Sequence, residues 1–93
     1  MGKGANVYII SRRAWHIEDL ECGTFEPILV SLDRAFATTT FNSVRSNVLR
    51  DKETTKFDGN VSEFGYHRKN WCYEYRIRVY ELNKFDALAY KQS

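Results

Sequence analysis

The sequence has few of the features that define a specialised class of protein. Its 93 residues include one proline and only two cysteines, Cys22 and Cys72, which are too few for a disulfide-held scaffold. No apolar stretch is long enough to span a bilayer, and the first residues do not have the pattern of a signal peptide. We therefore expect a reduced, cytoplasmic protein in which both thiols are packed as small side chains.

The patterns that mark metal sites and catalytic centres are also missing from the sequence. The chain has four candidate soft metal ligands, which are His16, Cys22, His67 and Cys72. Their spacing does not include the tight Cys-x2-Cys pair that is typical of zinc modules. His16 precedes Glu18 and Asp19, which sets a base beside two carboxylates, but no nucleophile motif accompanies them. No glycine-rich loop is positioned to hold phosphate. We expect no metal site, no cofactor and no catalytic residue.

What the sequence does contain is the composition of one small folded domain. Hydrophobic residues make up 43% and aromatic residues 15% of the chain, which is enough to fill a single core at this length. The net charge of +2 is too small to indicate a nucleic-acid-binding protein by itself. We expect residues 1–93 to form one domain, with its ordered core at about residues 6–83.

Three segments have the patterns of β-strands. Residues 6–11 form a short apolar run that can extend to residue 17, and residues 24–30 form a second strand. Pro27 removes a backbone donor, so the second strand either begins there or lies at a sheet edge. Residues 71–79 alternate, which places two sets of side chains on opposite faces: Trp71, Tyr73, Tyr75, Ile77 and Val79 on one, and Cys72, Glu74, Arg76 and Arg78 on the other.

A helix is expected after the second strand. Ser31 can cap its first amides, and Asp33 complements the positive end of its dipole. Two apolar stripes follow, rotated around the axis and separated by three threonines, so we expect the helix to kink or restart at residues 38–42. The polar residues 50–65, with a turn signal at 58–60, are expected to form a long loop. A short C-terminal tail follows the last strand. The predicted fold is α+β, with a small antiparallel sheet of three or four strands packed on one kinked or broken helix.

The alternating strand has two interpretations, a core strand with a solvated charged face or a stacking platform for nucleic acid. A platform needs rings and cations on one exposed face. The alternation instead puts them on opposite faces and places Glu74 among the cations, so we favour a core strand. The preceding residues 67–69, with the sequence HRK, are flanked by Tyr66 and Trp71. They form either a solvated turn or a binding site for a phosphate or an acidic partner.

Charge is segregated along the chain. Residues 14–33 contain acidic residues and no lysine or arginine, whereas residues 34–50 contain arginines and no acidic residue. Such a division can steer a charged partner towards the protein. The two segments can equally neutralise one another within the fold, and the sequence leaves both options open.

Several segments resemble short uncharacterised proteins encoded by bacteria and tailed phages. They are VYIIS near the start, ILVSLDRAFA at the entry of the helix and YRIRVYELN in the last strand, and the resemblance covers about residues 6–36 and 73–83. It implies a β-β-α-β pattern, an origin on a phage or mobile element, and a location in the host cytoplasm. Such small proteins often bind a host or defence-system protein and block it, anti-CRISPR inhibitors among them. The resemblance implies no catalytic residue.

The first functional hypothesis is therefore a small non-catalytic binding protein that occludes a host or defence-system protein. Its contact residues are expected to be those without an evident role in the core: Trp15, Glu18, Asp19, Glu21, Tyr66, Arg68 and Lys69. The alternative is a nucleic-acid-binding module that uses a basic helix and the 67–69 loop: Arg34, Arg45, Arg50, Arg68 and Lys69. We expect nucleic-acid binding to be weak, and we expect no membrane partner.

Overall fold

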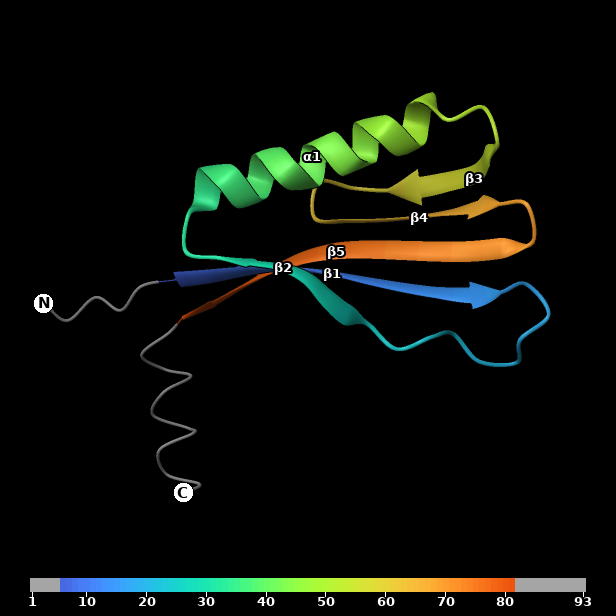
Figure 1. The fold of residues 1–93 in the computed structure, drawn as a ribbon, viewed down its shortest axis with the longest axis horizontal. Helices are drawn as coiled ribbons and strands as arrows, with labels where there is room; N and C mark the ends of the chain where they lie inside the picture. The colour runs from blue at the N-terminus through green and yellow to red at the C-terminus, as the bar shows by residue number, and fades with distance from the viewer. Residues whose placement is uncertain (1–5, 82–93) are drawn as a thin grey trace, which may run out of the picture.

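The computed structural model describes residues 6–81, which form one antiparallel sheet of five strands and a single helix (Figure 1). The elements are, in chain order, β1 (Asn6–His16), β2 (Glu26–Ser31), α1 (Arg34–Arg50), β3 (Thr54–Gly59), β4 (Glu63–Arg68) and β5 (Trp71–Glu81). The α+β class is confirmed, but the sheet in this part of the chain has five strands rather than three or four. The expected C-terminal tail lies outside the described residues.

The first and last strands form the centre of the sheet. The strand order is β2-β1-β5-β4-β3, and β1 pairs with β5 without interruption from Asn6 opposite Glu81 to His16 opposite Trp71. The predicted extension of the first strand towards residue 17 is confirmed. β2 lies at one edge of the sheet, as Pro27 predicted, because an outer strand tolerates a missing backbone donor.

The long loop predicted at residues 50–65 is wrong, because β3 and the start of β4 lie there. β3 has a polar sequence because it is the other edge strand, and within it only Phe57 packs against the core. Its register against β4 shifts between Thr55 and Asp58, and Lys56 has a φ of 53°. Apolar and polar residues therefore do not alternate along β3, and the sequence lacks the pattern that would identify it as a strand.

A side-chain-capped turn closes the β3–β4 hairpin. The Oδ1 atom of Asn60 accepts hydrogen bonds from the amides of Ser62 and Glu63, at 2.9 and 3.1 Å. Asparagine favours such turns because its side chain hydrogen-bonds to the backbone two residues further on. The turn signal at 58–60 was thus a hairpin signal rather than part of a long loop.

The helix α1 is continuous from Arg34 to Arg50, so the predicted kink or restart at residues 38–42 is wrong. One apolar stripe packs against the sheet: Ala37, Phe41, Val44 and Val48. The second expected stripe faces solvent, since Phe36 is 54% exposed. The three threonines have a weak helix propensity, which costs about 0.5 kcal/mol per residue. Burial of the single apolar stripe outweighs this cost.

The helix begins later than the sequence indicated. Asp33 is the N-cap, and its Oδ1 accepts from the amide of Phe36 at 3.1 Å. Ser31, the predicted cap, accepts from the amide of Asp33 at 3.0 Å and so supports the cap residue instead. As predicted, a side-chain oxygen at the start of the helix accepts from a backbone amide that has no partner within the helix, but the oxygen belongs to Asp33.

The core lies between α1 and one face of the sheet. Its most buried side chains come from both layers: Ile10, Ala37, Phe41, Val48, Phe64 and Tyr66. Aromatic rings pack across neighbouring strands, with centroids 5.1 Å apart for both Phe64–Tyr75 and Tyr66–Tyr73. Phe41 of the helix adds a tilted contact with Phe64 at 5.4 Å. Rings at these separations contribute beyond the area that they bury.

The expected faces of the last strand are confirmed for its central residues. Tyr73, Tyr75 and Ile77 pack against the core, whereas Val79 on the same side is exposed near the end of the strand. The opposite face, which we call the open face, is not covered by any helix or strand of residues 6–81. Arg76 is one of the side chains that the alternating sequence of residues 71–79 predicted for the open face.

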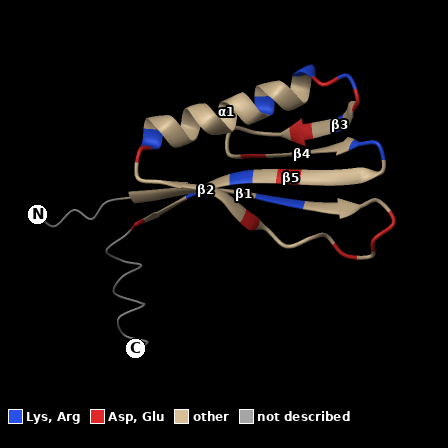
Figure 2. Cartoon of the chain, in the orientation of Figure 1, with Lys and Arg blue, Asp and Glu red and all other residues tan. Residues whose placement is uncertain are grey.

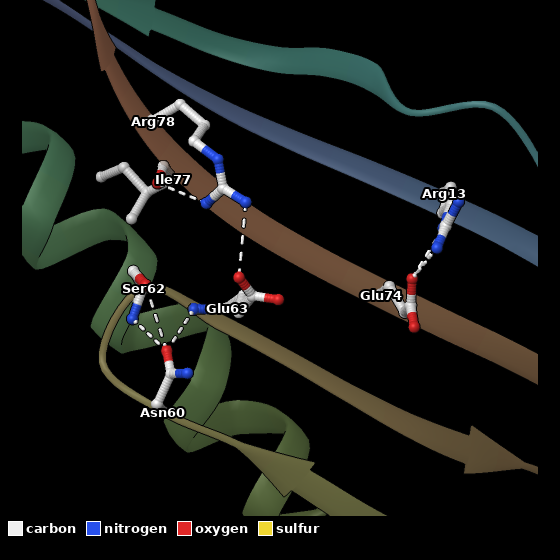
Figure 3. Close-up of polar contacts among 7 residues, drawn as sticks. All are labelled: Arg13, Asn60, Ser62, Glu63, Glu74, Ile77 and Arg78. Carbon is white, nitrogen blue, oxygen red and sulfur yellow. Dashed lines mark hydrogen bonds and ion pairs between the residues drawn. The ribbon is translucent and has the colours of Figure 1, made fainter.

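Ion pairs and one thiol occupy the open face. Arg13 contacts Oε1 of Glu74 through Nε at 2.6 Å, and Arg78 contacts Glu63 at 3.3 Å (Figure 3). Cys72 is buried there as expected, and burial raises the pKa of its thiol. The other thiol, Cys22, is exposed in the loop after β1, so its expected role as a packing group is wrong.

Candidate protein-binding surface at one end of the sheet

Two connections meet where β1 ends and β5 begins, at the same end as the C-terminus of α1 (Figure 1). The amide of Ile17 donates to the carbonyl oxygen of Asn70 at 2.8 Å, which joins the β1–β2 connection to the β4–β5 turn. We call this surface, formed by residues 16–21, 51–53 and 68–71, the loop end. The hydrogen bond fixes two segments that lie far apart in the sequence, so the surface is ordered before any partner binds.

Large apolar side chains are exposed at the loop end. Trp71 is 45% exposed, Ile17 is about as exposed, and Leu20 is fully exposed at the tip of its loop. The ring of His16 meets Trp71 edge to face, with centroids 5.5 Å apart and an interplanar angle of 87°. This contact holds the indole in one orientation while much of its surface remains accessible.

The acidic residues of the first connection lie in the same loop as Ile17 and Leu20. Oδ2 of Asp19 accepts from the amide of His16 at 2.9 Å, and Nδ1 of His16 accepts from the amide of Glu18 at 3.2 Å. The loop therefore leaves the strand through a turn with defined side-chain contacts. Glu18 and Glu21 are exposed and form no ion pair with any residue in the range 6–81.

The basic residues of the β4–β5 turn are part of an ion-pair cluster. Arg68 contacts Asp51 at 2.8 Å and Glu53 at 2.5 Å, and Lys69 contacts Glu53 at 3.5 Å. A hydrogen bond from the amide of Glu53, followed by one from Arg68, lowers the pKa of Asp51. The same pairing with Asp51 raises the pKa of Arg68. Figure 2 shows these charges beside the acidic loop at one end of the sheet.

The structure brings most of the predicted contact residues together. Glu18, Asp19, Glu21, Arg68 and Lys69 all lie at the loop end. Trp15 lies next to it on the open face, opposite Cys72, with the guanidinium carbon of Arg13 5.4 Å from the centroid of its ring.

Tyr66 is an exception, and its assignment as a contact residue is wrong. Its side chain is buried in the aromatic core between Phe64 and Tyr73, and this burial raises the pKa of its phenol. The sequence placed Tyr66 beside a loop because β4 was not recognised as a strand. Phe64 and Tyr66, two positions apart, were the available signal for an inward face.

The arginines of the alternative, nucleic-acid-binding hypothesis do not form one surface. Arg34 and Arg50 occupy the two ends of α1, about 24 Å apart at 1.5 Å per residue. Arg45 donates to the carbonyl oxygen of Asn60 and lies over the ring of Phe41, with its guanidinium carbon 5.5 Å from the centroid. Arg68 and Lys69 are paired with carboxylates, so within residues 6–81 the five residues of this hypothesis do not form one continuous cationic surface for phosphate.

Sequence reasoning missed Trp71, Ile17 and Leu20 as surface residues. Trp71 was assigned to the correct face of the last strand, but it is the first residue of β5 and lies at the end of the sheet. Ile17 and Leu20 lie in a connection that is otherwise polar, and apolar side chains in such a loop were the signal that could have identified them.

No group of three or more histidine, cysteine, aspartate or glutamate side chains within residues 6–81 is arranged to hold a metal ion. The helix described here is too short and too polar to cross a membrane. No family model, curated protein or solved structure matches this chain.

Proposed function

We propose that this chain is a non-catalytic protein-binding domain, and that the loop end is its contact surface. The observation that carries the proposal is the exposed group of Trp71, Ile17 and Leu20, set among charges of both signs. Interfaces combine an apolar centre with a polar rim, and tryptophan is among the residues that contribute most to binding.

The order of the loop end also supports the proposal. The hydrogen bond between Ile17 and Asn70, the cap formed by Asp19 and the ion pairs of Arg68 fix the surface in the free protein. A surface that is already ordered loses less conformational entropy when a partner binds. Affinity can then be high although the domain is small.

The charges indicate what kind of surface the partner presents. Glu18 and Glu21 are unpaired within residues 6–81, whereas Arg68 and Lys69 are already neutralised by carboxylates. The partner surface that faces the acidic loop is therefore basic, because complementary charge speeds association and aligns two proteins. In line with the resemblance to small phage proteins, we propose a host or defence-system protein that the domain blocks by occlusion, as anti-CRISPR inhibitors do.

The test is an affinity capture from a bacterial host lysate with tagged protein, with and without nuclease, followed by a binding titration with the purified partner. Trp71→Ala is expected to weaken binding roughly thirtyfold, since truncation of an interface tryptophan costs about 2 kcal/mol or more. Tyr80→Ala is the matched control, because Tyr80 is also 45% exposed and lies at the other end of β5.

Equal affinities of the two variants would show that the loop end is not the contact surface. A capture that disappears on nuclease treatment would point to the nucleic-acid alternative. In that case, affinity for DNA or RNA should fall by about 0.9 log unit per log unit of salt for each phosphate contacted on duplex DNA.

A further inference from the structure

His16 connects the two segments that form the centre of the loop end. It is the last residue of β1, and its backbone begins the turn of the first connection. Its amide donates to Oδ2 of Asp19 at 2.9 Å, and its carbonyl oxygen accepts from the amide of Asp19 at 2.9 Å. Its ring meets Trp71 edge to face, with centroids 5.5 Å apart. One residue therefore holds both the turn and the exposed indole.

The ring of His16 makes a hydrogen bond that depends on its protonation state. Nδ1 accepts from the amide of Glu18 at 3.2 Å. A ring nitrogen that accepts from an N–H group carries no proton, whereas both ring nitrogens of a charged imidazole are donors. Proton uptake at Nδ1 therefore removes the acceptor and leaves the amide of Glu18 without this partner.

The charges around His16 do not prevent its ring from taking up a proton. Glu18 and Asp19 follow it by two and three positions, and Asp19 already accepts from its amide. Across Trp71, the cation on β4 is Arg68, which stands opposite Trp71 and is neutralised by carboxylates. The other charged groups of the elements on this side of the sheet are Arg12, which lies over the ring of Tyr73, and Lys69, which contacts Glu53.

We infer that His16 is the positioning residue of the loop end and makes this surface dependent on pH. Histidine is the side chain that changes its charge between about pH 5 and 8. In the neutral form, the ring accepts from Glu18 and packs against Trp71. In the charged form, Nδ1 becomes a donor, and the carboxylates of Glu18 and Asp19 are the acceptors beside it. The turn then loses one of its hydrogen bonds, and a positive charge lies against the indole.

For a partner bound at the loop end, the consequence is weaker binding on acidification. A neutral hydrogen bond contributes about 1 kcal/mol, which corresponds to roughly a fivefold change in affinity. The charge on the ring also repels the basic partner surface proposed above. This consequence rests on the proposed function, whereas the coupling of His16 to Glu18 and Trp71 is a property of the free protein.

The test is a titration of the free full chain from about pH 8 to 5. NMR records the ring of His16 and the backbone amide of Glu18. Fluorescence records Trp71 in a Trp15→Phe background, where it is the only tryptophan. The three signals are expected to change with one common midpoint. An amide of Glu18 that does not follow the titration of His16, or an emission of Trp71 that is constant over the whole range, would overturn the inference.

His16→Asn separates the protonation of the ring from its structural role. Asparagine keeps an acceptor at the δ position, readily accepts from the amide two residues further on and cannot take up a proton in this range. The variant should lose the pH-dependent change in both the Glu18 amide and the Trp71 emission. His67→Asn is the matched control, because His67 is the only other histidine and stands opposite Cys72, and it should retain both changes.

A pH-dependent change that survives His16→Asn, or one that disappears in His67→Asn, would also overturn the inference. Circular dichroism checks that each variant is folded, and the wild-type titration decides the question if a variant is not. The proposed function fails separately, through equal affinities of Trp71→Ala and Tyr80→Ala for the captured partner.

Discussion

Replacing Phe41 by alanine tests how the helix is attached to the sheet. Its side chain is 1% exposed and contacts Phe64 of β4, whereas Phe36 in the same helix is 54% exposed. Truncation of a fully buried phenylalanine costs about 3–5 kcal/mol, part of it through the cavity that remains. A small domain is stable by about 5–15 kcal/mol, so Phe41→Ala should lose a large fraction of its free energy of unfolding.

The assay is equilibrium urea unfolding, followed by circular dichroism and tryptophan fluorescence. With a slope of about 2 kcal/mol per M, Phe41→Ala should shift the midpoint by about 2 M, and Phe36→Ala by about 0.3 M or less. Phe41→Leu, with an expected loss of about 1 kcal/mol, covers the case in which the alanine variant does not fold. Equal losses at positions 41 and 36 would refute the single buried stripe and the continuous helix that it supports.

Two further predictions concern titrating groups. Cys22 is exposed and Cys72 is buried with a raised pKa, so a thiol reagent should modify Cys22 rapidly and Cys72 only on unfolding. Similar modification rates for the two thiols would contradict the burial of Cys72. The pKa of Asp51 is lowered in the folded state, so this carboxylate stabilises the fold above its ordinary pKa of 3.8 and loses that contribution as the pH falls through the folded value. The free energy of unfolding of Asp51→Asn should therefore be lower than that of the wild type at neutral pH, and the gap between the two should narrow below pH 3.8. A gap that widens on acidification would exclude the assigned contacts of Asp51 with Glu53 and Arg68.

The central part of the fold could be predicted from the sequence because its signals are local. The alternation in β5 and the apolar run in β1 reflect which side chains are buried, and Pro27 marked an edge strand correctly. β3 could not be recognised because an edge strand with one core-facing side chain, Phe57, has a polar sequence. Tyr66 was misplaced for the same reason, since its burial depends on pairing with β5.

The candidate site could be predicted only in part, because it depends on which loops the topology brings together. Charge marked Glu18 and Arg68 as surface residues, but nothing local shows that the loop after β1 meets the turn before β5. The ion pairs of Arg68 with Asp51 and Glu53 likewise arise from the sheet order. Because of these long-range contacts, Arg68 and Lys69 are paired with carboxylates and are not free, and they lie at the same end of the sheet as the exposed Trp71.

Site-specific photo-crosslinking in cells of the proposed bacterial host tests the central claim most directly. A photoreactive amino acid is placed at Leu20, which is fully exposed at the loop end, or at Val61, which is highly exposed in the β3–β4 turn. The proposed contact surface predicts a discrete protein adduct from position 20, which is lost when Trp71→Ala is added, and no corresponding adduct from position 61. An adduct from position 61 alone, or equal adducts from both positions, would contradict the assignment of the loop end as the protein-binding surface.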